Sequence, residues 1–420
     1  MEKMMMGKGT SKFSTLTARD LVTVQTSHLR VRFELAEKSV LAEKAVQLVN
    51  ASFERYEQSQ GTIRVQPGQM VAEYQGEKMI LPLLETSWIK RLGQDMGPAA
   101  VKRQHEHACY NCLLEKDPEA TYNELWQLLG VSEGRRRAPK GFDFLPEEPL
   151  TMAPGSYLPR TPEDLATVPA PVMEETVSVL VEQYGCKKGQ AEAMIRAIAG
   201  IRAWCCPKIS ELSPGQLVWL TYSTKKSRRI DPRLFVPVVL TLLDPAEQTL
   251  VLSHHGEFKA LKVRQIERMT TEAWRQEGVL TSSDLEWLTF ASSTTIRICL
   301  EAYQERYGVI LPTAGTVLDM GRTLTHKKIV VEMALGGMTT KEIAERIYHT
   351  PVAVDAYLKT FDRLLILRYY RMPMSAITRV VGHGRRLIEE HLALAEKHFP
   401  TEDALKSYLE GRGIALEEIC

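Results

Sequence analysis

Three residues in the first third of the chain have side chains of the kinds that bind zinc. His105, Cys109 and Cys112 carry imidazole and thiol groups, and on a helix their i, i+4 and i+7 spacing places them on one face. A structural zinc site has four ligands, and no second Cys or His pair follows at finger-like spacing. Helical surface and core positions are therefore the default interpretation, and we predict no metal and no other cofactor.

Cationic side chains gather at two places where they can neutralise the phosphates of a nucleic acid. One is a predicted turn of the middle sheet, and the other is the start of a predicted helix, where backbone N–H groups also favour a phosphate. An ordinary solvated turn and a solvated helix start are the competing interpretations. The residues are Lys225, Lys226, Arg228 and Arg229 in the turn, and Arg322, Lys327 and Lys328 at the helix start.

Motifs of the common catalytic folds are missing from the sequence. It contains no P-loop, no dinucleotide-binding glycine fingerprint, no nucleophile elbow and no HExxH pair. Its acidic residues are too scattered to suggest the triad of a nuclease or transposase. We therefore expect no enzymatic activity.

The elements that would position a DNA-binding face lie in the last third, roughly Leu280 to Phe399. A helix-turn-helix needs a short first helix with apolar anchors, a tight turn, and a second helix whose inner face packs while its outer face meets the major groove. Three stretches have this pattern. One such unit alone is equally well explained as an αα-hairpin, and the tandem of three is what favours DNA binding.

In the first stretch, residues 280–288 form the predicted first helix and 291–297 begin the second. Ser282 or Ser283 can cap the first helix, and Ser292 or Ser293 can cap the second. Leu285 and Leu288 are predicted to pack inward. The exposed side of the second helix would then present Thr295 and Arg297 to DNA.

The second stretch, residues 338–358, has the sharpest pattern. Thr339 and Glu342 have the spacing of a capping box, and Pro351 suits the first turn of the second helix. Ile343, Ala344, Ile347, Val354 and Leu358 are the predicted scaffold, with Ala344 small enough for two helices to cross closely. The predicted DNA contacts are Thr350, Ala353 and Lys359.

The third stretch, residues 374–392, places Gly382 and Gly384 where a turn can need positive φ. Arg385 and Arg386 open its second helix, and they can reach phosphates or guanine edges.

Length and composition agree with a soluble protein of several domains. The chain has 420 residues, of which 44% are hydrophobic and 25% charged, and its formal net charge is +1. Seven irregularly spaced cysteines and no long apolar segment indicate a reducing cytoplasm without export or membrane insertion.

Hydrophobic periodicity predicts a mainly α, multidomain fold. We expect a helical N-terminal domain over residues 1–134 that includes a hairpin near residues 62–84, and a proline-rich linker over 135–171. Residues 172–266 should form a helix pair and a small antiparallel sheet, for which a barrel is one arrangement, with strands near 216–222, 235–243 and 249–255. Residues 267–420 should be the tandem helix-turn-helix region.

The C-terminal half also resembles an uncharacterised bacterial family, described as a domain of unknown function with a C-terminal helix-turn-helix. The resemblance runs from about Leu212 to Phe399, and the unit near Met338 is also similar to the helix-turn-helix of response-regulator transcription factors. The matching segments are Ser213–Leu217, Pro237–Leu240, Leu280–Arg297, Leu311–Gly315, Asp319–Lys327 and Met338–Arg363.

The sequence therefore predicts a cytoplasmic, bacterial, sequence-specific binder of double-stranded DNA, acting as a transcriptional regulator or as an accessory factor of a mobile element. A homodimer is a candidate assembly. One alternative is a protein-interaction scaffold, supported by the balanced charge and by acidic Asp355, Glu389 and Glu390 near the predicted DNA faces. A recombinase-like enzyme of a mobile element is the other.

Overall fold

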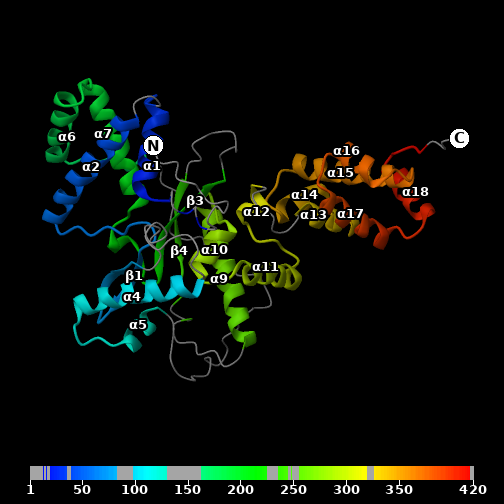
Figure 1. Cartoon of the computed structure of the whole chain (residues 1–420), viewed down its shortest axis with the longest axis horizontal. Helices are drawn as coiled ribbons and strands as arrows, with labels where there is room; N and C mark the ends of the chain where they lie inside the picture. Colours follow the sequence, from blue (N-terminus) through cyan, green and yellow to red (C-terminus); the bar gives the residue numbers. More distant parts are fainter. Residues whose placement is uncertain are drawn as a thin grey trace, which may run out of the picture. The chain divides into compact units, whose positions relative to one another are not determined.

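The computed structural model describes residues 13, 16, 19–35, 39–82, 98–129, 162–224, 235–244, 247, 255–318 and 326–416, with the backbone alone for 39, 98–102, 127, 255, 256, 258, 326, 327 and 386. Residues 1–307 and 308–420 form two compact units, each described here by itself. The predicted fold class is confirmed, since the chain is mainly α with a small antiparallel sheet in its middle (Figure 1).

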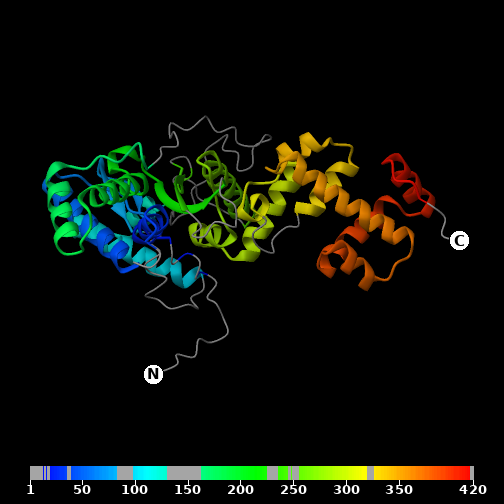
Figure 2. The same ribbon diagram turned by 90° about the horizontal axis from the view of Figure 1, so that it is seen from above.

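Four helices of the first unit pack side by side: α1 (Leu21–Arg32), α2 (Ser39–Ser59), α6 (Ala170–Glu182) and α7 (Lys188–Cys205). The blue and green helices remain adjacent in both views (Figures 1 and 2). Their apolar sides share one core, and a buried pair of amides, Gln25 and Asn50, exchanges hydrogen bonds of 3.2 and 2.7 Å within it. Helices from before and after the linker are thus parts of one cluster.

The C-terminal part of the predicted linker is packed against this cluster. Residues 135–161 lie outside the described residues, whereas a Cβ at Gly200 of α7 would collide with the carbonyl oxygen of Pro162. Helix α6 begins at Ala170, so Pro171 occupies the first helical turn, where its missing N–H costs nothing. Helices α4 (Pro98–Lys116) and α5 (Tyr122–Leu128) precede this segment.

One sheet combines strands from both sides of the linker. It comprises the hairpin β1 (Met70–Tyr74) and β2 (Glu77–Leu81), then β3 (Gln216–Ser223), β4 (Phe235–Thr241) and the short β5 (Gly278–Val279), with a 3-10 turn η2 (Ile209–Glu211) before β3. The order is β2-β1-β3-β4, and β1 and β5 pair with opposite ends of β3. The sheet is open rather than barrel-like in its described strands, and it joins regions that the sequence assigned to separate domains.

Helix α9 (His255–Arg275) covers the free edge of β4. Gln276 binds both the N–H and the C=O of Val239 at 2.8 Å, and Glu272 accepts the N–H of Thr241 at 2.7 Å. Pro237, which has no N–H to donate, is two residues from Val239 and so shares this outward side. Side chains therefore bind backbone groups of β4 that would otherwise be available to pair with another strand.

The strand predicted over residues 249–255 is wrong at its end, because His255 begins α9; residues 249–254 lie outside the described residues. Helical structure thus starts before residue 267, where the predicted tandem helix-turn-helix region begins. The turn of Lys225, Lys226, Arg228 and Arg229 also lies outside the described residues.

The second unit is helical in its described part. Its elements are the short α12 (Ala314–Val317), then α13 (His326–Leu335), α14 (Thr340–Arg346), α15 (Pro351–Tyr369), α16 (Met374–Val381), α17 (Arg385–His398) and α18 (Glu402–Gly411). Helix α15 contacts α13, α14, α16, α17 and α18, so it is the central element of this unit.

A buried ion pair holds the end of the first unit to its sheet. Asp284, in α10 (Ser282–Thr289), accepts hydrogen bonds from Arg19 and from Trp219 Nε1 at 3.0 Å. Arg19 also donates to the carbonyl oxygen of Leu220 at 3.1 Å, and burial lowers its pKa to about 10, which leaves it protonated at neutral pH. Residues far apart in the chain thus share one charged contact in the core.

Asp284 also caps its own helix. Thr281, not Ser282 or Ser283 as predicted, is the N-cap, because its hydroxyl and backbone N–H exchange hydrogen bonds with Asp284 three residues later. Helix α11 (Ser293–Tyr307) follows α10 after a short turn.

Asp284→Ala should destabilise the first unit by about 3–5 kcal/mol, because it leaves the charged Arg19 buried without its carboxylate. The free energy of unfolding of the full chain in urea measures this. Glu301→Ala is the control, since it breaks only the exposed 2.7 Å pair with Arg297, at a cost below about 1 kcal/mol. Equal losses in the two variants would contradict a structural role for the buried pair.

Candidate nucleic-acid interface

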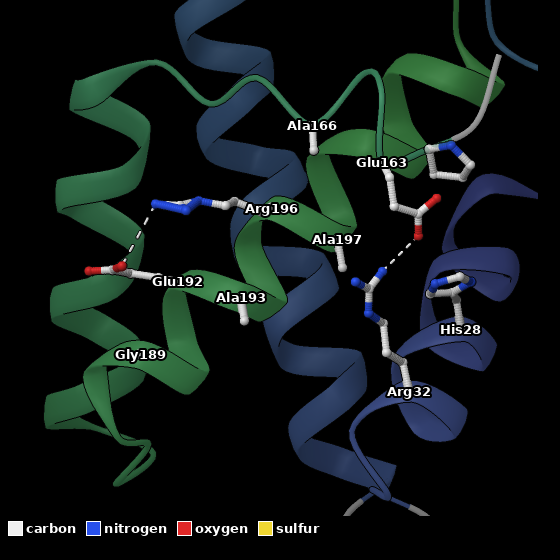
Figure 3. Close-up of a pocket in the computed structure, with 10 residues that line it drawn as sticks. His28, Arg32, Glu163, Ala166, Gly189, Glu192, Ala193, Arg196 and Ala197 are labelled. Carbon is white, nitrogen blue, oxygen red and sulfur yellow. Dashed lines mark hydrogen bonds and ion pairs between the residues drawn. The ribbon is translucent and has the colours of Figure 1, made fainter.

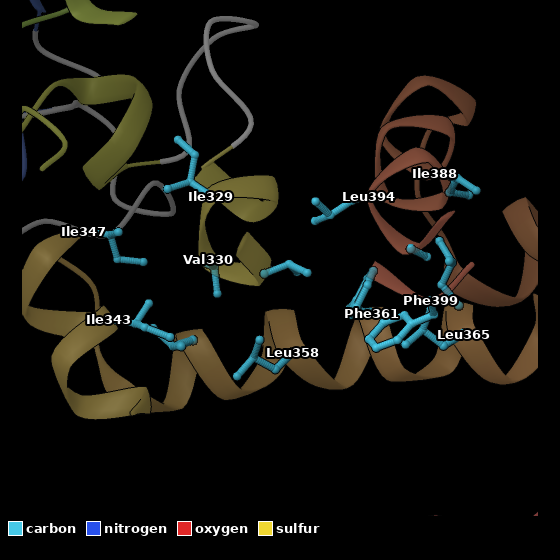
Figure 4. Packing of buried hydrophobic residues seen from close by; sticks show 14 of the residues in the cluster. Ile329, Val330, Ile343, Ile347, Leu358, Phe361, Leu365, Ile388, Leu394 and Phe399 are labelled. Atoms are coloured by element: carbon cyan, nitrogen blue, oxygen red, sulfur yellow. The ribbon is translucent and has the colours of Figure 1, made fainter. Parts of the chain in front are cut away.

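Helices α13, α14 and α15 pack as a three-helix cluster around apolar side chains. Figure 4 shows Val330 of α13, Ile343 of α14 and Leu358 of α15 within this packing, with Ile347 between the last two helices. All four side chains are buried. This core fixes which side of α15 points outward.

Local hydrogen bonds define where α14 begins. Thr339 is its N-cap, and the Glu342 carboxylate accepts the Thr339 backbone N–H and hydroxyl, each at 2.8 Å, which confirms the predicted capping box. The backbone hydrogen bond lowers the pKa of Glu342. The box is therefore complete at neutral pH and is lost as the pH falls through that lowered pKa.

Residues 347–350 form the turn between α14 and α15. Tyr348 adopts a positive φ of 58°, and the His349 N–H donates to the Ala344 carbonyl at 3.0 Å. Thr350 caps α15 by accepting the Ala353 N–H at 3.2 Å, and Pro351 stands at the first helical position as predicted. Ala344 is buried, so the small residue lies in the packed part of this helix pair.

The outward side of α15 is a continuous stripe of five exposed residues at helical spacing. Val352 is 78% exposed, and it is followed on the same side by Asp355, Ala356, Lys359 and Arg363. The buried residues Val354, Leu358, Phe361 and Leu365 interleave with them on the other side. We call this set of five exposed residues the α15 stripe.

The charges of the α15 stripe differ in how they are bonded. Within the described ranges, neither Lys359 nor Arg363 has a hydrogen bond or ion pair with another side chain, whereas the Asp355 carboxylate accepts the Thr340 hydroxyl at 3.3 Å. Exposed Lys341, on α14, is likewise unpaired among those residues. The two cations of the stripe are thus available to an external anion.

One of the three DNA contacts predicted for the second helix pair belongs to the α15 stripe. Lys359 belongs to the α15 stripe, Thr350 is exposed at the cap, and Ala353 is half-buried. Sequence reasoning missed Val352, Ala356 and Arg363. The signal that finds them is the inward repeat of Val354, Leu358, Phe361 and Leu365, since residues between these positions must face solvent.

The first predicted pair, α10 and α11, is part of the first unit. Leu285 and Leu288 are buried, and Ser292 accepts the Thr295 N–H at 3.2 Å, both as predicted. Asp284, Leu285, Glu286, Trp287, Leu288 and Thr289 of α10 are all buried. Thr295 is half-exposed, and Arg297 is exposed but forms an ion pair with Glu301.

In the third predicted pair, α16 and α17, one of the two glycines expected to have a positive φ has one. Gly382 has a positive φ of 70° at the end of α16, whereas Gly384 has a φ of −62° and precedes α17, so only Gly382 needs the freedom of glycine. Arg385 is exposed and paired with Glu389 at 2.7 Å; the Arg386 side chain is not described.

Helix α17 packs against the buried side of α15. Ile388 and Leu394 of α17 join the same apolar cluster as Phe361 and Leu365 of α15 (Figure 4). The third helix pair therefore packs against α15, which belongs to the second pair. Arg385 lies on α17, so it is not a continuation of the α15 stripe.

The predicted phosphate site before α13 is described only in part. Arg322 lies outside the described residues, and so does the Lys327 side chain, whose backbone is in α13. Lys328 forms an ion pair with Glu332 at 3.7 Å.

The three zinc-compatible residues lie on α4. His105 is buried with its ring edge-on to Trp287 and Phe290, at centroid distances of 5.2 and 5.7 Å, and burial lowers its pKa to about 3. Cys109 is buried and Cys112 half-buried. In the part of the chain that the structure describes, no three His, Cys, Asp or Glu side chains are grouped to hold a metal ion.

A pocket of about 320 Å³ opens between α1, α7 and residues 162–166. Figure 3 shows Arg32 paired with Glu163 at 2.8 Å and Arg196 with Glu192 at 3.7 Å around an alanine-lined wall. Each arginine is paired with a glutamate of the same pocket. The charges of these four side chains therefore do not indicate whether the pocket would bind an anion or a cation.

The chain belongs to a protein family of unknown function, DUF1670, whose model matches residues 180–394, from α6 to α17. The resemblance to a family of unknown function is thereby confirmed. No curated protein and no solved structure matches the chain. Among the described helices, none has the length and apolar character needed to cross a membrane.

Ala344→Leu should destabilise the second unit by about 1–3 kcal/mol, because the added methylenes enter a packed helix contact. Urea unfolding of the full chain, followed by circular dichroism, provides the measurement. Ala356→Leu makes the same chemical change on the exposed side of α15 and should shift the free energy of unfolding by less than about 0.5 kcal/mol. A tolerated Ala344→Leu would mean that α14 and α15 do not cross closely there.

Proposed function

We propose that the second unit binds double-stranded DNA, with α14 and α15 as the two helices of a helix-turn-helix and α15 as the recognition helix in the major groove. The observation that carries this proposal is the α15 stripe. Its two cations have no partners among the described side chains, and it lies opposite a fully packed side of the same helix. A helix held rigidly from behind can present side chains to base edges with little loss of conformational freedom.

Local geometry supports this proposal. Residues 347–350 are a turn of the length common in such motifs, and α13 supplies the third helix of the core. The hydroxyl proton of Thr350 and the side chains of Lys341, Lys359 and Arg363 provide donors for phosphates. Arg297 and Arg385 are weaker candidates, since each already neutralises a glutamate one turn away.

In this proposal the protein is a sequence-specific binder without catalytic activity. It regulates transcription or serves a mobile element, and it acts in the cytoplasm of a bacterium. Cys205, Cys206 and Cys299 form no disulfide, as a reducing compartment favours. A homodimer would present two α15 stripes to two half-sites one helical turn apart.

Lys359→Ala and Arg363→Ala should each weaken binding to random-sequence duplex DNA and reduce the slope of log K against log salt concentration by about 1, because each removes one phosphate contact. Titrations of the full chain at several salt concentrations measure both quantities. Lys397→Ala is the matched control, since it removes one exposed positive charge from α17, on the other side of α15.

The same titration compares how much each of the three helix pairs contributes to DNA binding. Arg385→Ala and Arg297→Ala should have smaller effects than Arg363→Ala, because their glutamate partners offset the lost charge. Binding that does not weaken with salt, or no binding at low salt, would overturn the proposal and favour a protein partner.

A further inference from the structure

The α15 stripe begins with apolar rather than charged groups. Val352, at 78%, is more exposed than any other large hydrophobic side chain in the described part of the chain. Pro351 and Ala356 are exposed beside it, so the first two turns of α15 offer solvent an apolar surface. Its helix is otherwise well packed, so this exposure is not a sign of a loose element.

The polar residues of the α15 stripe limit which class of partner this surface can bind. Lys359 and Arg363 follow Val352 by two and three turns and have no partner among the described side chains, which favours a polyanion over a neutral protein surface. Asp355 lies between Val352 and Ala356 in the sequence, where its carboxylate would repel a phosphate. The first two turns of the stripe therefore suit base edges, whose exocyclic amino groups are donors.

We propose that Val352, with Ala356 one turn later, contacts the C5-methyl groups of thymines in the major groove, so that the preferred duplex contains thymine at fixed positions. This inference rests on the proposed DNA binding. Among the four bases, thymine alone places a methyl group in that groove, and apolar side chains recognise it by excluding water. Lys359 and Arg363 hold the adjacent backbone, and cytosine, which lacks the methyl group, is disfavoured.

The test uses duplexes enriched by the full-length wild-type chain from a random-sequence library. Each enriched thymidine is replaced in turn by deoxyuridine, which keeps the hydrogen-bonding groups and lacks the methyl group. At contacted positions the dissociation constant should rise roughly four-fold, as expected for one buried methyl group. In Val352→Ala, an exposed position where folding is not at risk, the ratio between the two duplexes should fall towards one.

Lys359→Ala serves as the control for this cycle. It should weaken binding to thymidine and deoxyuridine duplexes equally and leave their ratio unchanged, because a phosphate contact does not sense the methyl group. Enriched duplexes without fixed thymines, a wild-type ratio of one, or an unchanged ratio in Val352→Ala would overturn thymine recognition while DNA binding stands. Failure to bind any duplex at low salt would overturn both.

Discussion

Burial of one side of α15 sets the rotation of that helix about its own axis, and the second unit depends on this constraint. Leu358 lies on the side of α15 that faces Val330 of α13, while Phe361 and Leu365 lie towards Ile388 of α17 (Figure 4). Removing these apolar groups from water stabilises the helix cluster and leaves one narrow side exposed. A core of this kind therefore also selects which side chains a partner can reach.

Charge pairing distinguishes one exposed cation from another. The chain has nearly equal numbers of acidic and basic residues, and many of its arginines form ion pairs at i, i+4 or across elements, as Arg385 and Arg371 do with Glu389 and Glu402. Net charge consequently says little about affinity for DNA. Local pairing says more, because an unpaired cation such as Arg363 meets a phosphate without first giving up a carboxylate.

Several elements set by neighbouring residues were predicted, although the N-cap of α10 was missed, whereas elements set by distant contacts were not predicted. The α14 cap, the hairpin near Gln75 and the positive φ at Gly382 follow from residues within a few positions of one another. The joining of β1 to β3 through Met70 and Leu217 does not, because strand pairing spans the intervening sequence. The start of α9 at His255 was not predicted either, because this helix packs against β4, which lies earlier in the chain.

By itself the sequence determined the capping box of α14, the proline at the start of α15 and the residues able to pack, because these depend on local propensity and periodicity. Only the tertiary structure decided that α10 is enclosed by the first unit, that Asp284 meets Arg19, and that α16 and α17 fold back on α15. It also decided which cations stay unpaired, and so moved the candidate interface from Arg385 to the stripe that ends at Arg363. Such outcomes depend on side chains brought together from distant positions, which no local pattern encodes.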